Sequence, residues 1–483
     1  MRAIRATCLI WAILIVDSLF AQAPDTLWTR LYGDFHGQDE GRCVRETGDG
    51  YITAGTKGVS GSYRDLWILK TDHDGNLLWE KTFGSSGDSD RGNSIALTSD
   101  GCYVIAGTVA SEGDAYTEAI LAKFDKSGNM IWKKTYSLDD YTKAHYVQET
   151  TDKGFVLIGT VWDWETSDPD IFILKTDADG NALAHKIIGT PDIYERGYSG
   201  QQTSDGGYII SGLKVESSSS YLYLIKLDSS LNITWEKTYS GCEGKGIKQL
   251  ADEGFIIASH KVVANDVEAW LIRTDKNGNI VKDITFGVPY DNDLLNSVDI
   301  TNDGGFVAAG YTHHSLPPQR RMFILKTDID LNTQWEKYIE CAHWAEANSI
   351  EETSEGNFII VGKGYNNSQN GCDLFLVKLG GSPGLSEKVR HPSPLSLDIF
   401  PNPCNRRVKI HYKVRNPCEL RVRILNASGQ VVKDISHGYA APGDYTLFWD
   451  GNDFSGRPLP SGIYFCQIEA SGSRLTERIV VMR

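Results

Sequence analysis

The 483-residue chain lacks the long apolar runs and short signatures that assign many proteins to a class at once. After residue 23, no stretch approaches the ~18 consecutive apolar residues that a membrane span needs, so we expect a soluble mature chain. The sequence contains no HExxH and no phosphate-binding loop, which excludes the usual motifs of zinc proteases and nucleotide-binding enzymes. A glycosidase remains open, because its two carboxylates can be distant in sequence.

Cysteine is scattered, with no arrangement that predicts a zinc site. None of the nine cysteines forms a C-x-x-C pair, and no two histidines stand at zinc-finger spacing. We expect mainly buried free thiols. A single bridge between Cys404 and Cys418 is the alternative, since oxidising compartments permit disulfides.

Positive charge is scarce, and what there is lies unevenly. The formal net charge is −15. Residues 396–483 hold twelve Lys and Arg against eight Asp and Glu, which leaves −19 for residues 1–395. An acidic body of this kind repels phosphate backbones and argues against nucleic-acid binding.

The N-terminus has the pattern of an export signal. Arg2 and Arg5 precede a mostly apolar run from residue 8 to residue 20, and Ala21-Gln22-Ala23 supplies small residues for cleavage. This run is shorter than a membrane span, so residues 1–23 are predicted to be a signal peptide. An uncleaved anchor helix is the alternative.

What the chain has in abundance is one unit that recurs about every fifty residues. Its clearest copy runs from Lys70 through Asp72 and Gly75 to Trp79, and its basic residue recurs at steps of 47 to 53 residues. Those positions are Lys70, Lys123, Lys175, Lys226, Arg273, Lys326 and Lys378. A fixed period in this range indicates a stacked or circular array of one supersecondary unit.

Each copy predicts four short strands. Asp-Gly turns such as Asp100-Gly101 separate the first two strands. The third strand is a continuous apolar run, as in residues 171–174, and the fourth alternates polar and apolar residues, as in residues 78–83. Four-stranded units arranged around a ring are propeller blades.

The ends of the array predict a closed ring. Seven copies of the first three strands are present, but the last copy stops near Gly381 without a fourth strand. An isolated fourth strand lies at residues 27–33. We therefore predict an all-β fold in which residues 24–381 form a seven-bladed β-propeller closed by the N-terminal strand, which leaves no open sheet edge. A solenoid is the structural alternative.

The repeated Asp, Gly and Trp residues invite a metal or cofactor interpretation. Asp72-x-Asp74-Gly75 looks like the start of a calcium loop, but the later ligands of such a loop are missing, and a hairpin turn is the simpler interpretation. A sialidase-type Asp-box is also unsuitable, because its aromatic residue stands three positions after the Gly and not four. The fourth-strand aromatic position is assigned to Trp28, Trp79, Trp132, Trp235 and Trp335, with Ala184 and Val281 as replacements.

This spacing is similar to the tryptophan-docking repeat of quinoprotein-type propellers, although the turn is one residue shorter. The resemblance implies that each Trp packs between neighbouring blades. It does not extend to a quinone, because the chain has no adjacent Cys pair and no recognisable calcium–quinone ligand set. We expect no cofactor and no metal site.

The loops between blades should gather at one mouth of the central channel, which is the predicted ligand rim. Acidic groups together with aromatic rings could bind a sugar, a peptide or a cation there, although Asp and Glu also cap turns. The candidate rim residues are His36, Asp39, Asp90, Tyr141, Tyr194, Glu195, Tyr290, Asp293, Trp344 and Glu346. The same loops contain Arg91, Lys143, His145 and Arg196.

A second candidate is an aromatic loop. Trp162 and Trp164 stand close together in a polar stretch, where they could form a sugar platform or fold back on the blade. No set of residues in the chain predicts a catalytic centre, so no catalytic residue is assigned.

Beyond residue 381 the period breaks. Residues 382–395 are rich in Pro, Gly and Ser and are predicted to be a linker. Residues 396–483 then show some seven short alternating strands, which predict an immunoglobulin-like β-sandwich.

This C-terminal module resembles the sorting domain of type IX secretion substrates and the related flagellar hook-cap immunoglobulin-like module. The resemblance covers nearly all of residues 396–483, and one departure is Cys404, where an aromatic is more usual. It rests on Pro401, Asn402, Pro403, Gly429, Trp449, Asp450, Gly451, Gly456, Gly462 and Tyr464. In that family the domain directs cargo across the outer membrane, so the resemblance implies export machinery as a partner. An accessory sandwich with no sorting role has the same fold.

The sequence thus predicts an exported, non-catalytic binding or scaffold propeller at the cell surface or outside the cell. Its ligand would be a glycan or a protein. The alternative is a secreted carbohydrate-active enzyme with carboxylates at the channel mouth, two of which would lie ~5–10 Å apart, at least one with a raised pKa.

Overall fold

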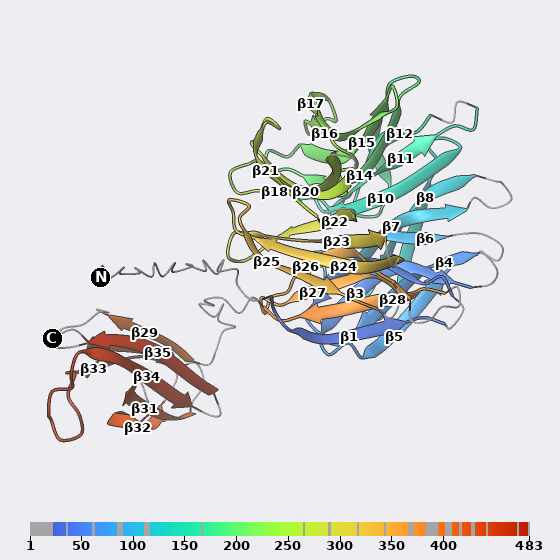
Figure 1. Ribbon diagram of the computed structural model, residues 1–483. Coiled ribbons are helices and arrows are strands. Elements are labelled where there is room, and N and C mark those ends of the chain that lie inside the picture. The colour runs from blue at the N-terminus through green and yellow to red at the C-terminus, as the bar shows by residue number, and fades with distance from the viewer. Residues whose placement is uncertain are drawn as a thin grey trace, which may run out of the picture. The chain divides into compact units, whose positions relative to one another are not determined.

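The chain folds into two compact units, Met1–Ser386 and Glu387–Arg483, which are described separately. The computed structural model describes residues 23–34, 37–59, 63–84, 90–110, 116–165, 168–263, 266–287, 291–315, 318–341, 344–365, 371–381, 395–400, 408–414, 418–426, 430–440, 443–470 and 473–481. The predicted signal peptide and linker lie outside these residues, apart from Ala23 and Leu395. Every regular element in the described residues is a β-strand (Figure 1).

The first unit contains 28 strands that pair into seven antiparallel sets of four. Blades 1 to 4 consist of β2 (Glu40–Thr47), β3 (Gly50–Gly58), β4 (Arg64–Thr71), β5 (Leu77–Phe83), β6 (Arg91–Leu97), β7 (Tyr103–Ala110), β8 (Thr117–Phe124), β9 (Met130–Tyr136), β10 (Tyr141–Glu149), β11 (Phe155–Trp162), β12 (Asp170–Thr176), β13 (Ala182–Ile188), β14 (Tyr194–Gln202), β15 (Tyr208–Glu216), β16 (Ser219–Leu227) and β17 (Ile233–Ser240).

The remaining three blades follow the same order, and the last one recruits the N-terminal strand. They consist of β18 (Gly246–Gln249), β19 (Phe255–Val263), β20 (Asp266–Thr274), β21 (Ile280–Phe286), β22 (Asn292–Ile300), β23 (Phe306–Ser315), β24 (Pro318–Thr327), β25 (Thr333–Ile339), β26 (Trp344–Glu352), β27 (Phe358–Tyr365), β28 (Asp373–Leu379) and β1 (Thr26–Tyr32).

The predicted closing strand is in place. β1 pairs antiparallel with β28, with Trp28 opposite Lys378 and Tyr32 opposite Leu374. At the same junction the Ser354 amide of blade 7 donates a 2.6 Å hydrogen bond to the Glu46 carboxylate of blade 1. The two ends of the array are therefore joined both within a sheet and between sheets.

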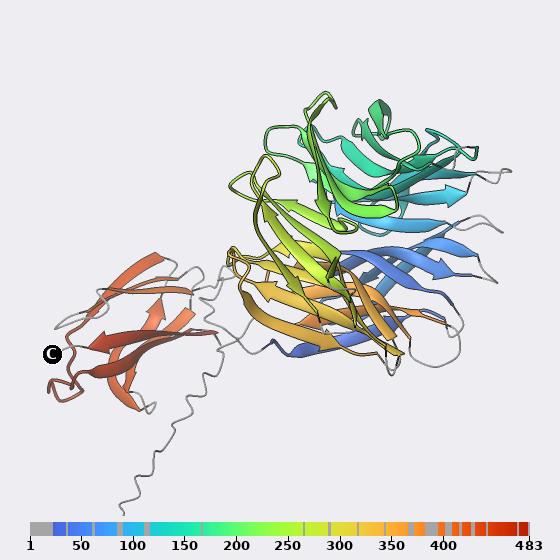
Figure 2. The same cartoon turned by 45° about the horizontal axis from the view of Figure 1, so that its top comes forward.

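Each blade buries its faces against its neighbours. Seven apolar clusters in this unit each combine buried residues from two consecutive blades. The cluster between the last and the first blade contains Trp67 and Leu69 together with Leu374 and Leu376. The clusters thus form an unbroken circuit, which makes this unit a β-propeller (Figure 2).

The repeated Trp docks on the next blade, as the packing interpretation predicted. Gly128 has a positive φ of 77°, and a Cβ added there would lie 2.7 Å from the Trp79 ring. The same contact joins Gly180 to Trp132 at 2.7 Å and Gly278 to Trp235 at 2.9 Å. Glycine at this turn therefore leaves room for an indole ring from the preceding blade.

Where the Trp is missing, the Gly is missing too. Leu231 replaces the Gly in the blade that follows Ala184, and it is buried even though its φ is +66°. Leu331 does the same with a φ of +59° in the blade that follows the second exception. In these two blades a buried leucine of the turn thus fills the space that an indole ring of the preceding blade fills elsewhere.

The second exception is Lys282, and the assignment of Val281 to the Trp position was wrong. Lys282 pairs with Arg273, just as Trp79 pairs with Lys70 and Trp235 pairs with Lys226. Val281 lies one residue earlier, and an offset of one residue along a strand moves a side chain to the opposite face of the sheet.

The second unit is an immunoglobulin-like β-sandwich, as predicted. One sheet has the order β29-β30-β33 and the other has the order β32-β31-β34-β35. Its strands are β29 (Leu395–Phe400), β30 (Val408–Val414), β31 (Cys418–Asn426), β32 (Val431–Ala440), β33 (Gly443–Trp449), β34 (Gly462–Ala470) and β35 (Ser473–Val481). Trp449 and Tyr464 pack edge to face in the shared core, with ring centroids 5.6 Å apart.

We predict that Leu231→Gly lowers the stability of the propeller and that Ala184→Trp partly restores it. Loss of a buried leucine costs about 2–5 kcal/mol, offset by about 1 kcal/mol of relieved left-handed strain. The added indole should refill the space, as Trp does beside Gly75, Gly128, Gly180 and Gly278. Denaturant unfolding of both single variants and the double variant measures the coupling. Additivity within about 0.5 kcal/mol would contradict the exchange.

Candidate ligand site at the channel mouth

The first strands of all seven blades surround a central cavity of about 290 Å³. Antiparallel order places the blade-to-blade links and the loops between second and third strands at one end of this channel, which we call the variable face. The other end carries the two repeated turns of each blade, and we call it the turn face. The loops that differ most among the seven repeats lie on the variable face, where binding sites on repeat scaffolds usually lie.

In six of the seven blades, a β-bulge in the first strand turns one side chain toward this cavity. In six first strands the register skips one residue where the strand enters the channel. Such a bulge re-aims the extra residue away from the sheet pairing. The bulge residues are Arg42, Asn93, His145, Tyr198, Asn296 and Asn348, and Lys245 precedes the first pair in blade 5; all seven line the cavity.

The three asparagines at this level link neighbouring blades. Asn93 donates to the Ala144 carbonyl at 2.7 Å, and Asn296 donates to the Ala347 carbonyl at 2.8 Å. Asn348 donates to the Gly41 carbonyl at 2.9 Å. An asparagine at the bulge position therefore stabilises the fold by joining two neighbouring blades.

The other four bulge-level residues are chemically diverse. Tyr198 donates to Glu243 at 2.9 Å, and Lys245 forms an ion pair with Glu243 at 2.5 Å. Arg42 contacts Glu40 at 2.9 Å. The ring of His145 lies 5.8 Å from that of Tyr198.

His145 is held neutral. Burial lowers its pKa to about 3, with further lowering from the charges of Lys245, Arg42, Arg196 and Lys143. A cationic imidazole at this position would face four other cations.

Closer to the variable face than the bulge residues lies an arc of three cations on blades 2, 3 and 4. Arg91, Lys143 and Arg196 each stand two residues before the bulge residue of their own strand. Burial lowers the pKa of Lys143, and the charges of Arg91 and Arg196 lower it further. The pKa of Arg91 is also lowered, first by burial and then by Arg42 and Arg64. In the described part of the chain no carboxylate forms an ion pair with any of the three.

At the equivalent positions of blades 1 and 7 the side chain is a carboxylate that is paired with cations. Glu346 pairs with Arg320 and lies 3.1 Å from Lys363. Glu40 pairs with Arg42 and lies 3.9 Å from Lys363. The mouth is therefore asymmetric, with its uncompensated positive charge on blades 2 to 4.

The turn-face end of the channel is occupied by a second charged group. Arg45 lies 3.8 Å from Glu351, and Lys248 lies 3.0 Å from Asp299. Burial raises the pKa of Glu351, although Arg45 opposes this. These four residues pair across blades 1, 5, 6 and 7.

The predicted rim carboxylates are buried against the protein itself. Asp39 accepts backbone hydrogen bonds from Asp34 at 2.9 Å and Gly58 at 2.7 Å, and burial nevertheless raises its pKa. Asp90 accepts a 2.9 Å bond from the Ala110 amide. Asp293 is 2% exposed.

Two further rim carboxylates are paired with cations. Glu195 contacts Lys214 at 3.3 Å and its pKa is raised by burial, while Glu346 has the two partners given above. Both are buried.

The predicted aromatic residues form a stack beside the arc. Tyr141 stacks on Trp162 with centroids 4.8 Å apart, and the Lys143 amine lies 4.6 Å from the centre of the Trp162 ring. Trp164 lies 6.2 Å from Tyr141 and is 67% exposed. Blade 3 therefore carries a cation and an exposed indole side by side.

The remaining rim aromatics also contact cations. The Arg196 guanidinium lies 4.7 Å from the Tyr194 ring centre, and that of Arg320 lies 4.5 Å from the Trp344 ring centre. His36 and Tyr290 lie outside the described residues. The candidate rim as a ligand site stays a prediction.

The sorting-motif residues that are described have structural roles. Trp449 donates to the Asn452 carbonyl at 2.9 Å, and Gly451 and Gly456 have positive φ values of 74° and 75°. Tyr464 donates to the Pro460 carbonyl at 3.0 Å. Pro401, Asn402, Pro403 and Gly429 lie outside the described residues.

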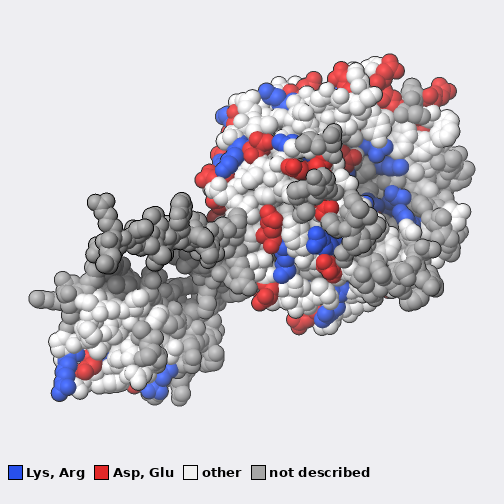
Figure 3. Space-filling view, in the orientation of Figure 1, with Lys and Arg blue, Asp and Glu red and all other residues white. Residues whose placement is uncertain are grey.

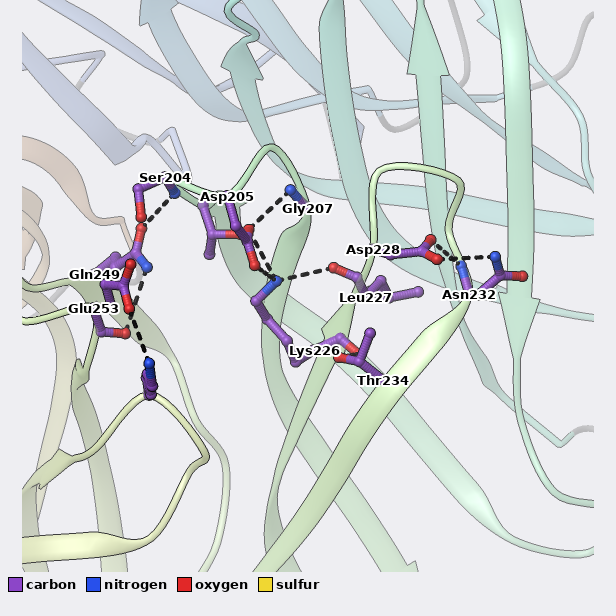
Figure 4. Close-up of polar contacts among 12 residues, drawn as sticks. Ser204, Asp205, Gly207, Lys226, Leu227, Asp228, Asn232, Thr234, Gln249 and Glu253 are labelled. Atoms are coloured by element: carbon purple, nitrogen blue, oxygen red, sulfur yellow. Dashed lines mark hydrogen bonds and ion pairs between the residues drawn. The ribbon is translucent and has the colours of Figure 1, made fainter.

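Figure 3 shows acidic and basic groups interspersed over one face of the propeller, with Lys and Arg gathered toward its right edge. The repeated Asp residues belong to the turn face and to turn geometry. Asp228 accepts the amides of Ser230 and Asn232 at 2.9 and 2.8 Å (Figure 4). Asp72, Asp125, Asp177, Asp275 and Asp328 do the same in their turns.

The Asp of the other repeated turn binds the repeated Lys. The Lys226 amine lies 2.8 Å from Asp205 and donates to the Leu227 carbonyl at 3.1 Å (Figure 4). Burial would raise the pKa of Asp205, but the bonds from Lys226 and Thr203 outweigh it and lower the value to about 2. In the described residues no three His, Cys, Asp or Glu groups are arranged to hold a metal.

Six of the described cysteines take part in no disulfide: Cys43, Cys102, Cys242, Cys341, Cys372 and Cys466. Cys404 lies outside the described residues, so the possible bridge to Cys418 stays a prediction.

Sequence reasoning missed the channel residues Arg42, Tyr198 and Lys245. The signal was present in the repeats as one position of the first strand, which follows a Gly or Ala in six blades and Leu295 in the remaining blade. That position is Asn in three blades and differs in four, but a β-bulge cannot be recognised from alternation alone.

Comparison with known proteins identifies the class of the second unit. Residues 406–473 match the family described as the FlgD Ig-like domain. No curated protein matches the chain by sequence.

Solved structures resemble the chain at low identity. PorZ, described as a bacterial surface component of the type IX secretion system of Porphyromonas gingivalis, is 10% identical with a TM-score of 0.42. The match covers 91% of this chain and 59% of PorZ, so this chain corresponds to about three-fifths of that protein.

Two further structures show the same level of likeness. The Dos1 propeller is 12% identical with a TM-score of 0.41, covering 73% of this chain and 94% of its own. The polysaccharide lyase Uly1 is 9% identical with a TM-score of 0.44, covering 70% and 90%. Such likeness concerns the fold alone.

The described residues contain no helix of the length and apolarity that a membrane crossing requires.

We predict that His145→Asn reduces the loss of stability on acidification. Because the folded-state pKa of about 3 lies below the unfolded value of about 6.5, only the unfolded chain binds this proton between these pH values. Stability therefore falls as pH drops through that window, by up to about 1.4 kcal/mol per pH unit. Asparagine preserves the bulge. Urea midpoints at pH 7, 6, 5 and 4 provide the measurement, and equal pH slopes for the two proteins would contradict it.

Proposed function

We propose that the chain is an exported binding or scaffold protein whose propeller binds its ligand at the channel mouth on the variable face. The observation that carries this is the departure of four bulge-level residues from asparagine. Arg42, His145, Tyr198 and Lys245 replace a side chain that links blades elsewhere, and they place mixed donors around a cavity of about 290 Å³. Concave sites with a few convergent polar groups are the usual form of a ligand site.

Binding is favoured over carboxylate-based hydrolysis. The rim carboxylates that the enzyme hypothesis would use accept backbone amides or pair with cations of the scaffold, as Asp39 and Glu195 do. A catalytic pair must reach the substrate, and the side chains of Asp39 and Glu195 are 0% and 1% exposed.

The channel pair of Glu351 and Asp299 is the best enzyme candidate that remains. The raised pKa of Glu351 is the property expected of a general acid. Both groups, however, are ion-paired with Arg45 and Lys248 at the turn-face end of the channel. This arrangement supports a structural role.

The second unit supports export. Its FlgD Ig-like match and the sorting-type motifs in residues 396–483 together favour a type IX sorting domain that delivers the propeller to the outer surface or the medium. The signal-like N-terminus would supply the first step, transfer to the periplasm.

We predict that replacing Arg42, His145, Tyr198 and Lys245 with Asn abolishes ligand binding but leaves the fold intact. Asparagine already stands at this level in three blades, so the bulges should persist. The mature full-length chain is applied to a glycan array and to a protein pull-down from the native secretome, alongside the quadruple variant. Unfolding midpoints check the fold.

The outer-strand variant Lys81→Gln provides a matched surface control. Undiminished binding by a folded quadruple variant would place the ligand elsewhere. Binding of proteins but not of glycans would show that the ligand is a protein, and the channel mouth would remain its proposed binding site.

We predict that deletion of residues 396–483 traps the propeller in the periplasm. The signal peptide alone directs transfer across the inner membrane, and the second step would depend on the deleted domain. Cell fractionation and immunoblotting of the native host measure the distribution. Unchanged export of the truncated chain would show that the sandwich is an accessory module.

A further inference from the structure

We propose that the ligand at the channel mouth is an acidic carbohydrate, a sugar bearing carboxylate or sulfate groups, bound by the arc of Arg91, Lys143 and Arg196. This rests on the proposed function, because it names the ligand class of that same site.

The arc is a local exception in an acidic protein. Residues 1–395 carry a formal charge of −19, yet three consecutive blades present a cation at one level of the mouth. The equivalent residues of blades 1, 5 and 7 are Glu40, Glu243 and Glu346, each paired with a cation. Chance placement in a chain of this composition would favour carboxylates at the arc as well.

The three cations repel one another, and no ion pair relieves this repulsion, although Glu40 favours the charge of Arg91 from a greater distance. No Asp or Glu lies within ion-pair distance of Arg91, Lys143 or Arg196 among the residues that the structure describes, and Arg42 and Lys245 lie just below them. Like charges crowded into a half-buried site cost free energy, which an incoming anion recovers. The site is therefore complementary to negative charge before any ligand arrives.

Neighbouring aromatic rings hold two of the cations in position. The Lys143 amine lies over Trp162, which in turn stacks on Tyr141. The Arg196 guanidinium lies over Tyr194. Cation–π contacts of this kind keep a positive charge in place without neutralising it.

The exposed indole favours a sugar over an acidic peptide. Trp164 is 67% exposed and lies on the same blade as Lys143, within 6.2 Å of Tyr141. A pyranose ring presents C–H groups on one face and its acidic group at the edge, so one rigid unit can contact both the indole and the arc. Aromatic side chains supply the large apolar surface that such a contact needs.

The acidic body limits how much polymer can bind. A long polyanion that leaves the mouth would run along a surface of like charge, whereas a short oligomer or a chain end would engage only the arc. Affinity should therefore depend little on chain length beyond a few sugar units and should fall with added salt.

The test measures binding of the mature full-length chain by calorimetry to four probes of matched length. These are oligogalacturonate, its sulfated neutral counterpart, unmodified neutral oligosaccharide and oligoglutamate. We expect binding of one or both acidic oligosaccharides, weakened by salt. Arg91→Gln/Lys143→Gln/Arg196→Gln should weaken it by about tenfold or more, since three partly exposed charges each contribute up to about 1 kcal/mol.

A charge-matched control isolates the arc from net charge. Lys81→Gln/Lys133→Gln/Lys186→Gln removes the same charge from outer strands β5, β9 and β13 and should leave affinity unchanged. Trp164→Ala should weaken acidic sugars but not oligoglutamate.

Four outcomes would overturn the inference. Tighter binding of oligoglutamate would assign the arc to an acidic peptide. Binding of the neutral oligosaccharide alone would show that the ligand need not be acidic, and the propeller would still be a glycan-binding domain. Binding of protein partners with none of the four probes would refute the carbohydrate class and leave the binding function standing, whereas failure of every ligand would remove both.

Discussion

The structure depends on the fact that no blade can bury its own two faces. A single four-stranded sheet exposes apolar surface on both sides, and each of the seven apolar clusters is shared by two consecutive blades. The circuit has no end, because β1 completes the sheet of β28 and its Trp28 packs onto the blade that follows. The contact between blades requires only that the space between them be filled. An indole ring facing a glycine fills it, and so does a buried leucine facing a short or polar side chain. Stability of one blade is thus inseparable from the identity of the next.

This constraint leaves the channel mouth free to vary. The bulge residues take no part in sheet pairing, and the loops on the variable face connect strands whose positions are already fixed by packing. Carboxylates near the mouth serve as hydrogen-bond acceptors for the links between blades, as Asp39 does for Asp34 and Gly58. The basic arc differs from these groups because the fold gives it no partner of opposite charge among the described residues, and a ligand can supply one.

Most of the fold could be predicted because its signals repeat. Seven copies of a turn, an isolated strand at one end and a missing strand at the other predict the blades and their closure, and strand alternation predicts a sandwich of some seven strands, as the structure has. The site was harder. Alternation tells which face of a strand is apolar, but a bulge breaks the alternation, so the positions of Arg42 and Tyr198 in the channel were hidden. The error at Val281 has a different origin: the repeated Trp lies four residues after the turn Gly, and the residue four after Gly278 is Lys282. Burial of Asp39 and Glu195 could not be predicted either, since Gly58 and Lys214, which bind them, each lie 19 residues further along the chain on the neighbouring second strand.

The pairing of the first strand with the last also sets an order in time. β1 leaves the ribosome and crosses any membrane before the rest of the propeller, but its partner β28 is the last strand of that unit to emerge. Until then the edge of the first strand is unsatisfied, and contacts between such distant segments form slowly because a long loop must close. Blades 1 to 6 have all their strands before β28 emerges, so only the last blade waits for the closing pair. The ring therefore cannot close before residue 379 has been synthesised.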